Sequence, residues 1–368
     1  MSSCVRCGSP AEHVYVAAKR IGRFSDEAVD VPMCHDCFMK YTPVFKRGNL
    51  VFKEHKNVRH TAFLIWYFSS VKATERLVSV IDRIANNRVV RRIVEGIPYV
   101  FGALGAIAVA VLVYGLVNAL TMSPETRIRL REFYRAYPLG GTGLVGIDPF
   151  FPVLEFLVAL FVTALVHEMS HALILRMYGY PVRRIGFVTF LVFPVGAYVE
   201  PPGRIEDRME RRALMQLGGA GVFANVVTAG ISFAAFMLLM AGIVPLRPEA
   251  LANLARMADH PLTFLAPPHM LAAFGFYTPL AAPEGWYTHA WLGDGYVLPM
   301  NLLFYVYFVN LWSGVLNCIP TFPLDGGLMV YSAIRDRFDQ STRGWVMFLL
   351  SLAVLGLMVT PILIQRLM

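Results

Sequence analysis

Charged residues are scarce in this chain of 368 residues: they make up 16% of it, against 56% hydrophobic residues. An ordinary soluble domain is about 25% charged. Four stretches contain no Asp, Glu, Lys or Arg at all, namely 96–124, 213–246, 295–324 and 344–365. Each stretch reaches the roughly 20 residues that a helix needs to cross the hydrocarbon core of a membrane. The composition therefore excludes an ordinary soluble globular protein.

A fifth apolar span is predicted at 152–178, although it carries Glu155, Glu168 and Arg176. The stretch 260–283 also lacks these four charged residue types, but several prolines interrupt it. Proline breaks regular helices, so a loop or a short re-entrant piece is a better prediction there than a sixth regular span.

The distribution of lysine and arginine predicts the orientation of these spans. Basic residues gather in 1–95 and in the loops 179–212 and 325–343. Because loops rich in Lys and Arg stay inside, we expect a cytoplasmic N-terminus. The first residues contain cysteines and charges, so we expect no cleavable signal peptide. The net charge of +8 suits contact with anionic lipid and gives no separate case for nucleic acid.

Two imidazoles and a carboxylate interrupt the span at 152–178, which is the second along the chain. They belong to the sequence HEMSH. His167 and His171 are four residues apart, so on a helix they share a face and can hold one metal ion. Glu168 stands beside them, where it can act as a base on a water molecule. The alternative is a pair of core histidines, but ionisable groups in a span are costly and usually functional.

A catalytic zinc ion normally has three protein ligands, and a later segment, NCIPTFPLDGG, offers the third. Asp325 follows the fourth span along the chain, 295–324, and is predicted to lie at the same depth in the membrane as the histidines. Gly326 and Gly327 allow close approach of the backbone. Alternatively, Asp325 caps the helix that we expect to begin near Leu328. The residues alone leave these two interpretations even.

Taken together, HEMSH and NCIPTFPLDGG resemble the site-2 protease family of intramembrane zinc metalloproteases. The second segment matches the family pattern N-x-x-P-x-x-P-L-D-G-G at every specified position. The resemblance covers roughly residues 98–368. It implies three zinc ligands and one general base: His167, His171 and Asp325 as ligands, and Glu168 as base.

The resemblance also implies two asparagines that contact the substrate, Asn317 and Asn225. Asn317 opens the second motif. In the third span, GGAGVFANVV matches the family element G-P-x-x-N at Gly221 and Asn225, but Val222 stands where proline is usual. For the glycines, close packing of helices is an equally good explanation.

Between the second and third spans, the segment 183–203 is rich in Val, Phe and Tyr and punctuated by Gly and Pro. This composition predicts a short β-hairpin. In the family that the chain resembles, such a hairpin dips toward the active site, and an exposed edge near 196–199 could hold an unwound substrate by main-chain hydrogen bonds. A plain connecting hairpin is the alternative.

Paired C-x-x-C motifs near the N-terminus predict a zinc ribbon in residues 1–40 with four thiolate ligands: Cys4, Cys7, Cys34 and Cys37. Disulfides are disfavoured on a cytoplasmic side, and His35 is an alternative ligand. Residues 41–97 form a basic, partly amphipathic juxtamembrane segment, in which we expect a helix over 61–95 on the inner leaflet. For the ribbon we favour a protein partner, and nucleic acid is not expected.

These features predict a polytopic α-helical membrane protein with about five to six transmembrane helices, a β-hairpin after the second span and an N-terminal zinc ribbon. The expected function is cleavage of transmembrane protein substrates within or near their spans, with one catalytic and one structural zinc ion. The alternative is a catalytically inactive zinc protein that binds transmembrane helices. A transporter would need polar groups across the second span, whose outer half, 157–166, offers only Thr163.

Overall fold

The computed structural model describes residues 2–20, 26–46, 48–54, 58–63, 66–136, 153–190, 193–201, 203–242, 297–322 and 324–367. The predicted loop at 260–283 lies outside these ranges. The chain falls into two compact units. The first contains Met1–Gly105, Ala164–Ala224 and Asn317–Ser351, and the second contains Ala106–Thr163, Asn225–Leu316 and Leu352–Met368.

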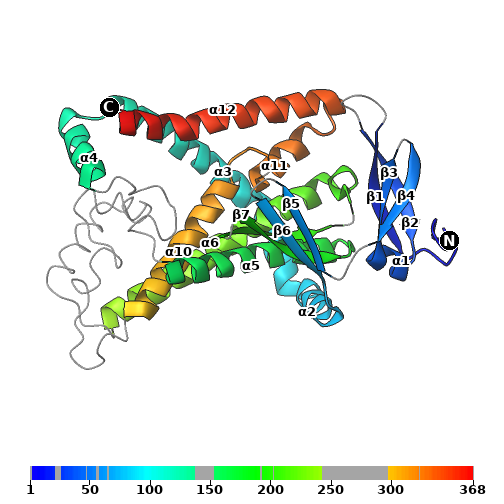
Figure 1. The fold of residues 1–368 in the computed structure, drawn as a ribbon. Coiled ribbons are helices and arrows are strands. Elements are labelled where there is room, and N and C mark those ends of the chain that lie inside the picture. Colours follow the sequence, from blue (N-terminus) through cyan, green and yellow to red (C-terminus); the bar gives the residue numbers. More distant parts are fainter. Residues whose placement is uncertain are drawn as a thin grey trace. The chain divides into compact units, whose positions relative to one another are not determined.

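Among the described residues, four helices are long and apolar enough to cross a membrane, and a shorter apolar helix accompanies them at Leu302–Asn317. The four are α3 (Arg88–Thr121), α5 (Val153–Met177), α6 (Arg211–Gly242) and α12 (Gln340–Leu367), and the shorter one belongs to α10 (Val297–Asn317) (Figure 1). Two further helices are α4 (Pro124–Ala136) and α11 (Asp325–Ile334). The predicted fold class, an integral membrane protein of apolar helices, is confirmed.

The N-terminal ribbon is built from two hairpins and a short helix. Its elements are β1 (His13–Arg20), β2 (Asp26–Met33), α1 (His35–Lys40), β3 (Tyr41–Lys46) and β4 (Asn49–Glu54). Strands β1 and β2 pair in antiparallel fashion from His13 opposite Met33 onward. Met33 and Phe38 are completely buried in the small core of the ribbon, which also contains cysteines.

The predicted hairpin is present as β7 (Arg184–Phe190) and β8 (Phe193–Glu200), and it belongs to a larger antiparallel sheet. The strand order is β5–β6–β7–β8, with β5 at Val58–Phe63 and β6 at Trp66–Lys72. Strands β5, β6 and β7 are labelled in Figure 1. The helix predicted over 61–95 is therefore wrong before Ala73. This stretch is rich in aromatic residues, which suit strands, and β7 supplies its backbone partners.

Helical structure in this region starts with α2 (Glu75–Ala85), which is capped by Thr74. The hydroxyl oxygen of Thr74 accepts a hydrogen bond from the backbone N–H of Leu77, as an N-cap residue should. On its inner face, α2 buries Ile81 against Ala172 and Leu175 of α5. The amphipathic pattern that the sequence shows from Leu77 onward thus does describe a helix.

A buried arginine joins the ribbon to the start of β7. The side chain of Arg183 is only 2% exposed. Its guanidinium group lies over the ring of Phe38, with 4.8 Å from Cζ to the ring centroid, and it donates a hydrogen bond of 2.9 Å to the carbonyl of Tyr41. Burying a cation is costly unless it is paired, so these ribbon contacts stabilise Arg183 where it stands.

The ribbon also meets the chain just beyond β8. The backbone N–H of Arg204 donates to the carbonyl of Val16 over 3.0 Å. Gly203 has φ +83°, and a Cβ atom at this position would lie 2.0 Å from the same carbonyl oxygen. Only glycine tolerates this conformation and this approach together. A side chain contact adds to it, because Arg208 pairs with Asp30 at 3.0 Å.

We expect the Arg183→Ala variant to loosen the ribbon. Hydrogen bonds to charged groups are worth about 1.5–3 kcal/mol, so amide hydrogen exchange in β3 and β7 should rise by about tenfold or more. The exposed Arg212 provides the control, and Arg212→Ala should leave exchange in these strands unchanged. Equal protection of β3 and β7 in Arg183→Ala and in the unaltered protein would show that Arg183 does not hold the ribbon.

Candidate metal centre and active site

The HEMSH segment lies in the C-terminal half of α5, where its histidines share a face. The metal-binding atoms of His167, Glu168 and His171 all lie within 4.8 Å of one another. The two imidazole rings are 4.7 Å apart between centroids. His167 is buried, whereas Glu168 and His171 are partly buried. The arrangement predicted from the i, i+4 spacing is therefore present, and these three side chains can hold a metal ion.

The structure brings Asp325 to the two histidines. One carboxylate oxygen, Oδ2, is 3.1 Å from Nε2 of His167, and the other, Oδ1, is 3.4 Å from Nε2 of His171. Asp325 is the first residue of α11, and the N-cap position belongs to Leu324. Asp325 therefore faces the histidines from inside the first turn and does not occupy the capping position.

The donor atoms fit a divalent metal ion. Around a tetrahedral zinc ion with bonds of roughly 2.0–2.1 Å, two ligand atoms lie about 3.3 Å apart. The separations between Asp325 and the histidines are close to this value. Moreover, Oδ2 of Asp325 is buried and, although it lies 3.1 Å from Nε2 of His167, it accepts no well-aligned hydrogen bond from the residues that the structure describes. A buried carboxylate oxygen needs a partner, and a cation bound between these side chains would supply it.

A backbone carbonyl orients His171. Its Nδ1 lies 2.8 Å from the carbonyl oxygen of Leu217 on α6. The carbonyl can only accept, so Nδ1 carries the proton, and the lone pair of Nε2 points toward Asp325. Such outer partners of metal-ligating histidines fix the tautomer and the direction of the ring. This contact could not be predicted from the sequence. Every residue has a backbone carbonyl group, so nothing in the sequence marks the carbonyl of Leu217 as the partner of His171.

Two glycines allow close contacts at and beside the site. A Cβ atom on Gly221 of α6 would lie 2.4 Å from Cε1 of His167, and one on Gly326 would lie 2.2 Å from the carbonyl oxygen of Ile319. Both distances are too short for any side chain. In the sequence, Gly221 stood out only as part of a partial match to a family motif. The structure gives the physical reason for this glycine, which is its direct contact with the ring of His167.

The two asparagines belong to different compact units. Asn317 is the last residue of α10 and is half-buried. Asn225 lies on α6, is fully buried and donates from Nδ2 to the hydroxyl oxygen of Ser313 over 3.0 Å. A buried amide in an apolar helix needs such a partner. The structure thus gives Asn225 a contact within the protein, and its predicted contact with substrate stays a prediction.

The four N-terminal cysteines form a second cluster. Their sulfur atoms lie within 4.8 Å of one another, and Sγ of Cys7 is 3.5 Å from Sγ of Cys34. Burial and the neighbouring thiols raise the pKa of Cys37 to about 12. A bound dication would favour the thiolate forms and offset the repulsion between four thiolates this close together. The cluster is compatible with the predicted zinc ribbon.

Comparison with known protein families identifies a family for the larger part of the chain. The family model described as "Peptidase family M50" matches residues 155–358, which is more than half of the chain. No curated protein and no solved structure matches the chain significantly. The matched range contains α5 from its third residue onward, the β7–β8 hairpin, α6, α10 and α11. It therefore includes His167, Glu168, His171 and Asp325.

We expect Gly221→Ala to displace the ring of His167 and to lower the metal content of this site. The matched control is Gly230→Ala on the same helix, because a Cβ atom at Gly230 meets nothing within 4 Å. Alanine is also the better helix former, so the control should bind metal fully. Metal analysis of both purified variants by mass spectrometry makes the comparison. Full metal content in Gly221→Ala would mean that His167 can move without losing the ion.

Proposed function

The chain belongs to peptidase family M50, and we propose that it is an intramembrane zinc endopeptidase of the site-2 protease type. In this proposal it hydrolyses peptide bonds within or near the transmembrane segments of membrane proteins. The observation that carries the proposal is the meeting of Asp325 with His167 and His171, beside Glu168, among apolar helices. Catalysis gives each of these four side chains a task.

His167 and His171 would hold the catalytic zinc ion through their Nε2 atoms, and Asp325 through its carboxylate. When bound, zinc supplies a water molecule of lowered pKa and polarises the carbonyl that is attacked. Glu168 accepts the proton of the attacking water on its carboxylate and returns it to the departing amine. The carbonyl of Leu217 keeps the proton of His171 on Nδ1, so that Nε2 would be available to hold the ion.

We further propose that β8 receives the substrate. A peptide bond can be attacked only in an unwound segment, and an unwound backbone has unpaired N–H and C=O groups. Strand β8 pairs with β7 on one side and ends the sheet among the described strands. Its outer edge can therefore add a further strand from the substrate. Asn317 and Asn225 remain the amides that we propose for contact with substrate.

The basic loops support a cytoplasmic N-terminus and a cytoplasmic active-site end, from which water reaches the zinc ion. Helix α2 suits the surface of the inner leaflet, because it exposes Val80 and Ile84 together with Arg76 and Arg83. Residues 98–368 would be the protease domain. Residues 1–40 would hold the structural zinc ion and bind a protein partner, and the β3–β4 hairpin beyond them packs against the same core.

The Glu168→Gln variant should keep its metal and lose its activity, because the glutamine amide cannot accept the proton. Metal content is measured on the purified protein. Activity is measured in cells as new N-termini within membrane-spanning segments, which makes no assumption about the substrate. Glu155→Gln, in the first turn of the same helix, is the control and should behave like the unaltered enzyme. If the protein is an inactive binding protein, cells with the unaltered protein and cells with Glu168→Gln will show the same N-termini. That result would contradict the proposed activity.

The Asp325→Asn variant should lose both zinc and activity, since a neutral amide is a poor zinc ligand. Outer-shell changes lower metal affinity or activity by about 10–100-fold, and a lost ligand should exceed this. A capping role predicts a mild effect instead, because Asn caps about as well as Asp. The exposed Asp336 supplies the control, Asp336→Asn. Full zinc occupancy with normal turnover in Asp325→Asn would place the third ligand elsewhere.

A further inference from the structure

Three side chains of the ribbon belong neither to the cysteine cluster nor to the HEMSH site. The metal-binding atoms of Glu12, His13 and His35 lie within 4.8 Å of one another. Nε2 of His13 is 3.0 Å from Nδ1 of His35. Glu12 and His35 are exposed and His13 is half-buried, so an ion from solution can reach all three.

The fold of the ribbon holds these side chains together. His13 opens β1 and pairs with Met33, while His35 is the first residue of α1. The backbone N–H of Glu12 donates to the carbonyl of Met33 over 3.1 Å. The ring of His13 also packs on Phe38, with 4.8 Å between centroids. The donor atoms therefore converge before any ligand arrives, which lowers the entropic cost of binding one.

The chemistry of the three donors selects one class of ligand. A hydrogen bond between two neutral imidazoles accounts for the contact of 3.0 Å, but it does not account for the third donor, Glu12. Two ligand atoms on a tetrahedral zinc ion lie about 3.3 Å apart, so a small ring movement would admit the ion. Imidazole nitrogen suits zinc and its neighbours, whereas calcium and magnesium prefer oxygen.

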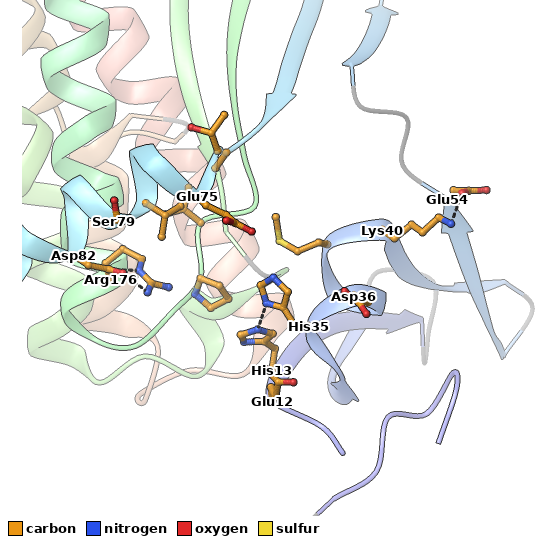
Figure 2. Close-up of a pocket in the computed structure, with 16 residues that line it drawn as sticks. Glu12, His13, His35, Asp36, Lys40, Glu54, Glu75, Ser79, Asp82 and Arg176 are labelled. Atoms are coloured by element: carbon orange, nitrogen blue, oxygen red, sulfur yellow. Dashed lines mark hydrogen bonds and ion pairs between the residues drawn. The ribbon is translucent and has the colours of Figure 1, made fainter. Parts of the chain in front are cut away.

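We propose that Glu12, His13 and His35 bind a divalent transition metal ion, separately from the cysteine cluster and from the site on α5. The site lies in the wall of a cavity of about 1340 Å³, whose other walls include residues of α2. Figure 2 shows the rings of His13 and His35 joined by the dashed hydrogen bond, with Glu12 next to His13. The cavity leaves room for water molecules to complete the coordination.

The charges around the cavity favour a cation. Its two basic side chains are already paired: Lys40 lies 3.5 Å from Glu54, and Arg176 lies 2.6 Å from Asp82 (Figure 2). In the ranges that the structure describes, no lysine or arginine pairs with the other carboxylates that line the cavity, Glu12, Asp36 and Glu75. An excess of one sign of charge in a concave surface raises the local concentration of the opposite ion.

The test counts zinc on the full-length protein in detergent. The protein is dialysed until only tightly held zinc remains, and then equilibrated with rising zinc concentrations. We expect the unaltered protein to take up one equivalent that the double variant His13→Gln/His35→Gln lacks, and Glu12→Gln to bind this equivalent more weakly. Asp36→Asn, from the same cavity but outside the three donors, should bind like the unaltered protein. Excess magnesium should not displace the ion.

Cobalt loading shows whether the ribbon stays intact, because the sulfur-to-cobalt absorption reports the cysteine cluster alone. If the double variant loses this absorption, its ribbon is not intact, and the zinc affinity of Glu12→Gln then decides whether the proposed site exists. The proposal is overturned if the double variant takes up as much zinc as the unaltered protein, if Asp36→Asn loses the equivalent as well, or if Glu12→Gln binds with unchanged affinity. Cleavage is not measured, so the outcome is independent of the proposed peptidase activity.

Discussion

The carboxylate of Asp325, buried against two imidazoles, is the constraint on which the rest of the region that matches peptidase family M50 depends. Its environment is apolar, and an uncompensated charge there would be costly. His167, His171 and a cation would offset that cost only at separations near those observed, 3.1 and 3.4 Å. Helices α5 and α11 are distant in sequence, and they must therefore meet at a fixed distance. Neighbouring segments must leave room for the three side chains between these helices.

The ribbon contacts the chain at both ends of the β7–β8 hairpin. Arg183, just before β7, is buried against Phe38, and Gly203, just after β8, lies against the carbonyl of Val16. A structural metal that orders the ribbon would therefore also restrain the strand that we propose as the substrate's partner. The cysteine cluster and the hairpin are thus coupled through packing, although they are far apart in sequence.

The sequence could predict features that depend on the spacing of nearby residues. It could not predict features that depend on contacts between segments far apart in the chain. Runs without charge predicted the apolar helices, and the i, i+4 spacing predicted the shared face of His167 and His171. The residues alone left Asp325 even between ligand and cap, and only its position in the fold places it against the histidines. Nothing local tells that β6 pairs with β7, because that partner lies more than a hundred residues further along the chain. The helix that we expected over 61–95 therefore begins only after Ala73, and the residues before it form strands of this sheet.

Helix α6 shows how one small-residue segment builds a site. Gly221 accommodates the ring of His167, Gly218 lies close to the backbone of Asp325, and Gly219 lies against Ile97 and Phe101 of α3. Small residues that let helices approach are common in membranes, but here two of them also border candidate metal ligands. Val222 is fully buried where proline is usual in the family that the motifs resemble. Because valine keeps the N–H group that proline lacks, α6 can run unbroken through the glycines, and the close contact with His167 depends on Gly221 itself.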